Sequence, residues 1–328
     1  MQPKTILRAF QAYGIRPDYV DLPQGGYRNK VYTTHYDGGQ LANLILYKNE
    51  PGILPKIQQA NRLSDHLHSK GLPVRHTINK RILMLSSRRS IQYASLYNCL
   101  PGTTIAWEAY TKDHLKALGL AMAGVHQNSA DLPHKDEPNI SNMCAKQIKS
   151  MQKYFSDQGV KSAMHEKLRI TIASSVLSKL SELVQVTAKG EQLLHMDFVR
   201  GNVLFQSAQD SSDAWTVGKV QISGVIDFEK VAYGKTVFDI ARTVAFLLVD
   251  CKHKTKAQVY KYFLDSGYVK RGRGKGPNPN ELDRLIQYYL VYDFYKFLKH
   301  SPYKTLRQNL HFRRTVSILL QYKLLEVV

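Results

Sequence analysis

His195-Met196-Asp197-Phe198-Val199-Arg200-Gly201-Asn202 is the most informative stretch of the chain, and Ile226-Asp227-Phe228 follows it further along. The two segments supply one carboxylate that can accept a proton from a hydroxyl group, and an amide oxygen and a second carboxylate that can bind Mg²⁺. Phosphoryl-transfer enzymes carry a histidine, an aspartate and an asparagine in this order, before a second aspartate. We therefore predict Asp197 as the catalytic base and Asn202 and Asp227 as the metal ligands. Each residue by itself would more simply be a solvated or turn residue, but the set occurs in order and at a suitable spacing.

The sequence around these residues predicts a small sheet. Three short apolar runs are bounded by turn residues and read as strands: Gln192–Leu194, Asn202–Phe205 and Val220–Ile226. Asp197 then lies in the loop between the first two strands, and Asp227 lies directly after the third. We expect this arrangement to bring Asp197, Asn202 and Asp227 to one edge of the sheet.

Three motifs in order resemble a known family: His195-x-Asp197-x-x-x-Gly201-Asn202-Val203-Leu204-Phe205, Gly224-Val225-Ile226-Asp227-Phe228-Glu229 and Gly234-x-x-x-Phe238-Asp239-Ile240-Ala241. The chain resembles the aminoglycoside phosphotransferase and choline kinase-like family, small-molecule kinases with a protein-kinase-like fold. Two departures appear, because Met196 stands where glycine is common and Lys235-Thr236 replaces the usual Asp-Pro. The resemblance implies that His195 and Asp239 are structural supports, with Asp239 bracing the catalytic loop.

The resemblance also implies the domain organisation. We expect an α+β, bilobal protein-kinase-like fold with a small antiparallel-sheet N-lobe at residues 1–96, which covers the nucleotide. A hinge at residues 97–102, whose backbone would bind the adenine edge, leads to a larger, mainly helical C-lobe at residues 103–328. This lobe would carry the catalytic loop and the acceptor site.

The N-lobe should contain the nucleotide-binding parts. The turn at Gly25 and Gly26 resembles the family's phosphate-covering turn, where glycine allows positive φ and close approach to the nucleotide; a plain hairpin turn is the alternative. Side chains alternate along Leu44–Lys48, so Leu46 and Lys48 share a face. This matches the apolar-x-Lys pattern of the kinase strand, and we predict that Lys48 reaches the nucleotide phosphates; a surface lysine at a strand end is the alternative.

The glutamate that pairs with this lysine in typical kinases is difficult to locate. A helix is predicted from Leu54 to Lys70, followed by the stop signal Gly71. Its relevant turn, Gln58–Arg62, carries no carboxylate. The ion pair is therefore absent, replaced by a glutamine or asparagine, or supplied by Glu50.

Apolar periodicity predicts the remaining helices. They are a short helix at Thr5–Tyr13 and longer ones at Asp113–His126, Ser141–Ser156, Ala163–Val186, Asp239–Val249, Glu281–Lys299 and Thr305–Leu325. We interpret His126, at the end of its helix, as a packed or capping residue.

Composition places limits on the environment of the chain. Its 328 residues are 43% hydrophobic, which suits a globular protein with two lobes. The three cysteines, Cys99, Cys144 and Cys251, form no metal or disulfide pattern, which favours a reducing compartment. The N-terminus lacks a signal-peptide pattern and no apolar run is long enough to span a membrane, so we expect a cytoplasmic protein.

The net charge of +20 bears on the acceptor. A polycationic aminoglycoside needs an acidic pocket, so we expect a neutral or anionic, sugar-like hydroxyl compound as acceptor, with ATP and Mg²⁺ as cofactors.

Two alternatives stay open. One is a non-catalytic kinase-like module that binds nucleotide or an anionic surface, such as nucleic acid, through the basic loop Arg271–Pro277. The other is a Ser/Thr protein kinase-like enzyme.

Overall fold

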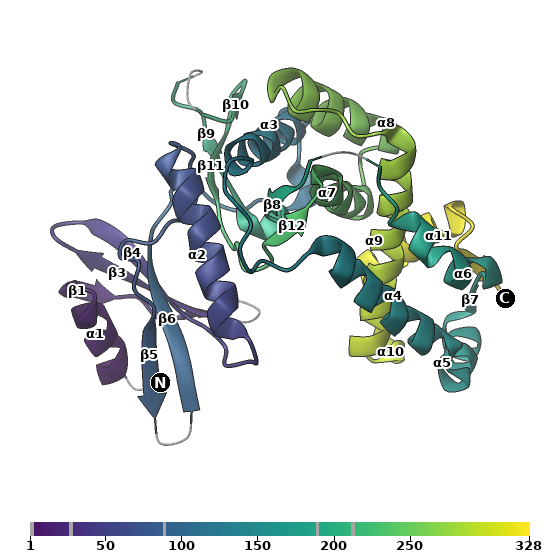
Figure 1. Cartoon of the computed structure of the whole chain (residues 1–328), viewed down its shortest axis with the longest axis horizontal. Coiled ribbons are helices and arrows are strands. Elements are labelled where there is room, and N and C mark those ends of the chain that lie inside the picture. Colours follow the sequence, from purple (N-terminus) through teal and green to yellow (C-terminus); the bar gives the residue numbers. More distant parts are fainter. Residues whose placement is uncertain (1–2, 26–28, 88–89, 188–189, 211–213) are drawn as a thin grey trace.

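A computed structural model describes residues 3–25, 29–87, 90–187, 190–210 and 214–328 of the chain (Figure 1). Two lobes lie side by side, the sheet lobe on the left of Figure 1 and the helical lobe on the right, with helix α2 (Ile53–Ser69) between them. Within the described ranges, no helix has both the length and the apolar composition that a membrane crossing requires.

The first lobe is built on an antiparallel sheet in the order β1-β3-β4-β6-β5, with β2 paired to β3. Its strands are β1 (Pro17–Val20), β2 (Gln24–Gly25), β3 (Lys30–Tyr36), β4 (Gln40–Leu46), β5 (Leu83–Ser87) and β6 (Ser90–Asn98). Asp37, Gly38 and Gly39 turn the chain between β3 and β4, all with positive φ, which glycine adopts without strain.

Both faces of this sheet are covered. Leu44 and Leu46 of β4 pack with Phe10 of helix α1 (Pro3–Ala12). Ile45 and Tyr47 belong to a separate cluster with residues of α2 on the other face. Alternation along the strand therefore directs even-numbered side chains toward α1 and odd-numbered ones toward α2.

The second lobe is mainly helical, and its apolar core is continuous with residues of α2. Its longer helices are α3 (Lys112–Ser129), α4 (Ile140–Ser156), α6 (Ser174–Leu183), α7 (Thr236–Asp250), α9 (Pro279–His300) and α11 (Leu310–Gln321). Shorter helical segments are η1 (Trp107–Ala109), α5 (Gln158–Ala163), η2 (Met164–Leu168), η3 (Arg200–Asn202), α8 (Lys256–Val259), η4 (Tyr260–Arg271) and α10 (Tyr303–Leu306). Small antiparallel pairings are formed by β7 (Ile170–Ile172) with β13 (Leu325–Val327), β8 (Gln192–Leu194) with β12 (Ala232–Gly234), and β11 (Val220–Val225) with β9 (Val203–Ser207) and β10 (Thr216–Val217).

The single helix predicted at Ala163–Val186 is wrong. Arg169 adopts φ 59, the left-handed region that a continuing helix does not allow. The β-branched run that follows forms β7 and pairs with β13, and a helix resumes only at α6. The predicted helix Thr305–Leu325 is likewise divided into α10, α11 and the start of β13. The connection between the lobes begins after β6, at Cys99, inside the predicted hinge.

Candidate active site

The structure brings Asp197, Asn202 and Asp227 together at one cleft of about 460 Å³ between the lobes. The loop after β8 carries Asp197, the short η3 turn ends at Asn202, and Asp227 follows β11. Val225 of β11 lies opposite Val203 of β9 in an antiparallel pair. Asn202, just before Val203, and Asp227, just after β11, therefore lie at the same end of this pair.

Asp197 is buried and receives hydrogen bonds from three side chains. Lys230 Nζ donates to both carboxylate oxygens at 2.8 Å, Arg242 donates to Oδ1 at 3.2 Å, and Asn202 Nδ2 donates to Oδ2 at 3.0 Å. A carboxylate has about four acceptor positions, and these four hydrogen bonds fill them. Burial raises the pKa of Asp197, but the positive charges of Arg242 and Lys230 outweigh burial and lower it. The carboxylate is therefore ionised at neutral pH.

His195 and Asp239 support the loop from behind. Asp239, in the first turn of α7, accepts hydrogen bonds from the backbone N–H groups of His195 and Met196, both at 3.1 Å. His195 Nδ1 accepts a hydrogen bond from the backbone N–H of Asp197 at 3.1 Å. Its Nε2 therefore carries the proton and donates a hydrogen bond to the backbone carbonyl oxygen of Ile226 at 3.1 Å. Met196 has φ 60, which explains why glycine is common at this position.

His126 lies next to this support. Its ring nitrogens contact Tyr268 Oη at 2.9 Å and Asp239 Oδ2 at 3.2 Å. The side chain is fully packed between helices, as its interpretation as a structural histidine requires.

Asn202 and Asp227 have the donor atoms that a magnesium ion needs. The Asn202 amide nitrogen donates to the backbone and side chain of Asp197, which leaves its Oδ1 as the outward atom. Within the described parts of the chain, no hydrogen bond reaches this oxygen or the Asp227 carboxylate. Asp227 has φ 63, a conformation that costs about 1–3 kcal/mol and is typical of functional sites. Carboxylate and amide oxygens suit a hard cation, so these residues fit Mg²⁺.

The structure does not bring Lys48 to the cleft. Its side chain is exposed, it is not among the residues that line the cleft, and its backbone N–H donates to Asn29 Oδ1 at 3.1 Å. The odd-numbered Ile45 lines the cleft instead. The predicted role of Lys48 in phosphate binding therefore stays a prediction. Gly25 lies in β2 opposite Lys30, and Gly26 lies outside the described residues.

Asn61 is the buried polar residue of the α2 turn Gln58–Arg62. Asn61 of α2 accepts a hydrogen bond from Tyr97 Oη at 2.6 Å, and Tyr97 Oη contacts Tyr47 Oη at 2.5 Å. Glu50 accepts a hydrogen bond from Lys56 at 3.0 Å. Of the substitutes considered from the sequence, the asparagine therefore occupies the inward position on α2.

Three cationic residues at the site were missed. Lys230 follows the Asp227 motif directly, and Arg242 is the one charged residue of α7 between Asp239 and Asp250; both were detectable as charges in or beside a motif. Arg75 lies in the loop between α2 and β5 and lines the cleft, and no local pattern marks it.

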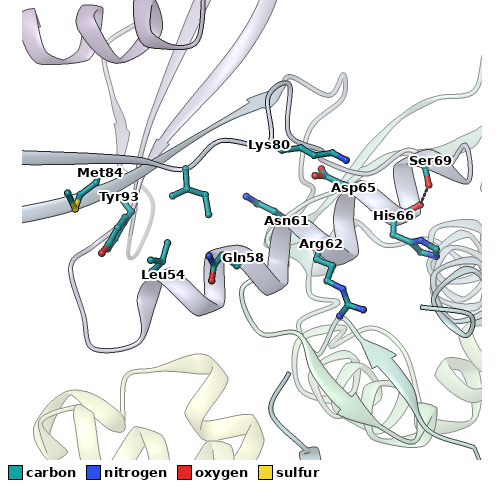
Figure 2. A pocket seen from close by; sticks show the side chains of 11 residues that line it. Leu54, Gln58, Asn61, Arg62, Asp65, His66, Ser69, Lys80, Met84 and Tyr93 are labelled. Carbon is teal, nitrogen blue, oxygen red and sulfur yellow. Dashed lines mark hydrogen bonds between the residues drawn. The ribbon is translucent and has the colours of Figure 1, made fainter. Parts of the chain in front are cut away.

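A larger groove, of about 850 Å³, lies between α2 and the β5–β6 hairpin (Figure 2). Several of its polar side chains already have partners elsewhere, since Asp65 accepts hydrogen bonds from Thr77 and Arg62 pairs with Glu137. None of the predicted site residues lines this groove. The smaller cleft, where the acidic residues meet, is therefore the candidate site.

The chain has recognisable relatives. The sequence profile of the phosphotransferase enzyme family matches residues 20–267. Stress response kinase A of Salmonella choleraesuis is 22% identical over 206 residues, which cover 63% of this chain and 61% of that protein. The homologue from Salmonella typhi matches equally. The chain thus spans less than two thirds of the length of these curated relatives.

Solved structures of small-molecule kinases superpose on nearly the whole chain. An amicoumacin kinase in complex with AMP-PNP, Ca²⁺ and Ami has a TM-score of 0.67 at 13% identity, covering 97% of this chain and 94% of that one. A microcompartment-associated aminopropanol kinase has a TM-score of 0.62 at 14% identity, covering 98% and 100%. A macrolide 2'-phosphotransferase from Brachybacterium faecium has a TM-score of 0.57 at 16% identity, covering 97% and 98%. These likenesses confirm the predicted bilobal, protein-kinase-like fold.

Proposed function

The chain belongs to the phosphotransferase enzyme family, and from this membership we propose that it transfers the γ-phosphate of ATP, with Mg²⁺, to a hydroxyl group of a small molecule in the cytoplasm. The observation that carries the proposal is the meeting of Asp197, Asn202 and Asp227 at one cleft. A base and two oxygen ligands are the groups that such a transfer requires.

Asp197 would accept the proton of the acceptor hydroxyl while the oxygen forms a bond to the γ-phosphorus. The bond from that phosphorus to the bridging oxygen breaks, and ADP leaves.

Because all acceptor positions of Asp197 are filled, one donor must withdraw before the hydroxyl can bind. Lys230 is the mobile candidate, since its side chain is 46% exposed whereas that of Arg242 is 11% exposed. A withdrawn Lys230 ammonium would remain close enough to stabilise the charge of the transferred phosphate.

Asn202 Oδ1 and the Asp227 carboxylate would hold Mg²⁺, which neutralises charge on the phosphate oxygens. His195 and Asp239 would keep the loop in its position through the hydrogen bonds described above. Neither residue faces the cleft, so their role is support.

The acceptor is proposed to be neutral or anionic and sugar-like. Lys230 and Arg242 both contact Asp197, and Lys296 lies near them. Burial lowers the pKa of Lys296, and the charges of Arg242 and Lys230 lower it further, against the opposite effect of Asp293. Two cations in contact with Asp197 and a third near them would repel a polycationic acceptor and favour one with negative charge.

Transfer of label from γ-labelled ATP into a host metabolite extract tests this function. We expect label in a small molecule with the native protein and a loss of roughly 10²–10⁴-fold with Asp197→Asn, the range typical of a general base. Asp18→Asn, an exposed carboxylate in the sheet lobe, is the matched control and should transfer normally. Label found only in the protein fraction would instead support the Ser/Thr protein kinase-like alternative.

One observation favours a second candidate, the non-catalytic nucleotide-binding module. Lys48 is not among the residues that line the cleft, and the α2 turn Gln58–Arg62 carries no carboxylate. Nucleotide binding by the native protein without any transfer above the Asp197→Asn level would support this module and refute the kinase.

A further inference from the structure

Within the described ranges of the chain, no cation of β3 or β4 lines the sheet side of the cleft. Its lining residues include Val31 and Ile45, which are cross-strand partners in β3 and β4 and are both apolar. A triphosphate is highly charged, and kinases bind it with a positively charged side chain next to the metal. Among the described residues that line the cleft, the cations are Arg75 and Lys230, and Lys230 is paired with Asp197.

Arg75 is a buried cation at this position. It is only 7% exposed, yet it lines the cleft together with Asp227 and Glu229. Its Nε is buried and has no hydrogen-bond partner within the described part of the chain. A buried guanidinium without an acceptor is costly unless a ligand completes it.

The backbone of Arg75 is fixed to the strand that leads to Asp227. The Arg75 N–H donates to Val225 O at 2.9 Å, and the Val225 N–H donates to Pro73 O at 3.0 Å. Val74 and Val225 thus form a parallel bridge. The guanidinium lies over the Tyr97 ring, 4.4 Å from its centre, a stacking contact that favours a cation.

The surroundings keep this side chain charged. Burial lowers the pKa of Arg75, but the nearby acidic groups of Tyr47, Tyr97, Asp227 and Glu229 outweigh burial and raise it. A charged group with one unpartnered buried donor, Nε, therefore lines the same cleft as the proposed metal ligand Asp227.

We propose that Arg75 binds the nucleotide phosphates in place of a strand lysine, with its guanidinium positioned by Tyr97 and by the pairing of its backbone with Val225. This inference rests on the proposed use of a nucleotide. A planar guanidinium can donate two parallel hydrogen bonds to phosphate oxygens, and Arg75 lines the same cleft as Asp227.

Binding measurements test the proposal without requiring turnover. The dissociation constants of Mg²⁺–AMP-PNP and of adenosine are measured by calorimetry for the native protein and Arg75→Gln. We expect the variant to bind AMP-PNP roughly tenfold to 100-fold more weakly, as the loss of charge-assisted hydrogen bonds implies. Its adenosine affinity should stay unchanged, because adenosine has no phosphate.

Two further variants make the result specific. Arg75→Lys keeps the charge and should retain much of the AMP-PNP affinity, and Ile45→Lys in the Arg75→Gln background should restore part of it from the strand. Arg16→Gln removes an exposed arginine of the same lobe and serves as the control for net charge.

Equal AMP-PNP affinity of the native protein and Arg75→Gln would overturn the proposal. A loss of AMP-PNP affinity in Lys48→Gln but not in Arg75→Gln would also overturn it. A parallel loss of adenosine affinity in Arg75→Gln and Arg75→Lys would assign Arg75 a purely structural role and also overturn it. Absence of nucleotide binding by the native protein would refute the proposed function itself, and this outcome is distinguishable from the others.

Discussion

Asp197 receives hydrogen bonds from two positively charged side chains, and this environment determines how it can act as a base. A carboxylate with a lowered pKa stays ionised in mild acid, but it holds a proton weakly. Such a base suits phosphoryl transfer, in which positioning and charge stabilisation contribute more than proton removal.

Lys230→Met should move the acid limb of the pH profile of kcat/KM to higher pH. Activity is lost as pH falls through the pKa of Asp197, and removing the Lys230 charge raises this pKa. We also expect kcat to fall roughly tenfold to 100-fold, because a charge-assisted contact to phosphate is lost. Steady-state kinetics from about pH 4 to about pH 8 would check both effects.

Lys219→Met, which removes an exposed lysine outside the cleft, should leave the profile unchanged. An acid limb that stays in place in Lys230→Met would contradict the assignment of Asp197 as the titrating base.

Sequence reasoning reached the acidic residues but not all of their partners. The motif gives the type and order of Asp197, Asn202 and Asp227, and the strands beside them have clear apolar runs; their catalytic roles stay predictions. Alternation along Leu44–Lys48 shows which residues share a face, but it does not show which face adjoins the cleft. Ile45 and not Lys48 is among the lining residues, and the role of Lys48 stays a prediction. Both faces of this sheet are covered by helices, so hydrophobicity could not distinguish them. Arg75 depends on a long-range parallel pairing that no local pattern encodes.

Helix packing dominates at the scale of the elements. Helix α3 and the π-helix η4 approach so closely that their backbones touch at glycines. A Cβ atom built on Gly119 would lie 2.1 Å from the carbonyl oxygen of Phe263. Sequence periodicity predicted α3, but a π-helix and its close contact need tertiary information.

Gly119→Ala should therefore destabilise the fold by about 1–3 kcal/mol or more, since a backbone atom cannot yield as a side chain does. Urea unfolding measures this change. Gly276→Ala is the control, because its Cβ would meet only Val269 Cγ2 at 3.4 Å. Equal stability of the two variants would show that α3 and η4 can separate without cost.

A second contact between elements depends on pH. His311 of α11 contacts Asp250 of α7 at 2.7 Å and Asp293 of α9 at 2.8 Å. Burial lowers the pKa of His311, but the two carboxylates raise it from 6.5 to about 9. The stabilising effect is therefore complete below pH 6.5 and is lost as pH rises through about 9.

We expect His311→Gln to lose about 3 kcal/mol or less of unfolding free energy in mild acid, and progressively less in alkali. Urea unfolding of native and variant protein across this pH range gives the difference. His253→Gln replaces an exposed histidine and should show no such trend; a pH-independent difference for His311→Gln would refute the assigned charge.

The whole molecule is held together by α2 as well as by the hinge. Arg62 of α2 pairs with the buried Glu137 and donates to Pro133 O. Lys70 donates to Asp131 at 2.7 Å, and His66 contacts Asn128 O at 2.8 Å. One helix of the sheet lobe is thus tied to the last turn of α3 and to the segment between α3 and α4 of the other lobe.

Arg62→Ala should loosen this tie, leaving the Glu137 carboxylate without its arginine at a cost of about 1–3 kcal/mol. We expect a larger radius of gyration in small-angle scattering and weaker nucleotide binding, although Arg62 does not line the cleft. Lys56→Ala breaks an ion pair inside the sheet lobe and should leave the radius unchanged. Reduced stability of Arg62→Ala with an unaltered radius would argue against an interlobe tie.

The parallel bridge between Val74 and Val225 has a consequence for expressing the two lobes separately and for recombining them with those of a relative. Backbone hydrogen bonds join a segment of the first lobe to a strand of the second. Neither lobe alone therefore contains both partners of these hydrogen bonds. Cutting the chain at the hinge would leave the N–H and C=O groups of Val225 without their partners at Arg75 and Pro73. Separately expressed halves should need each other to fold, and recombination with a relative should succeed only when both lobes are exchanged together.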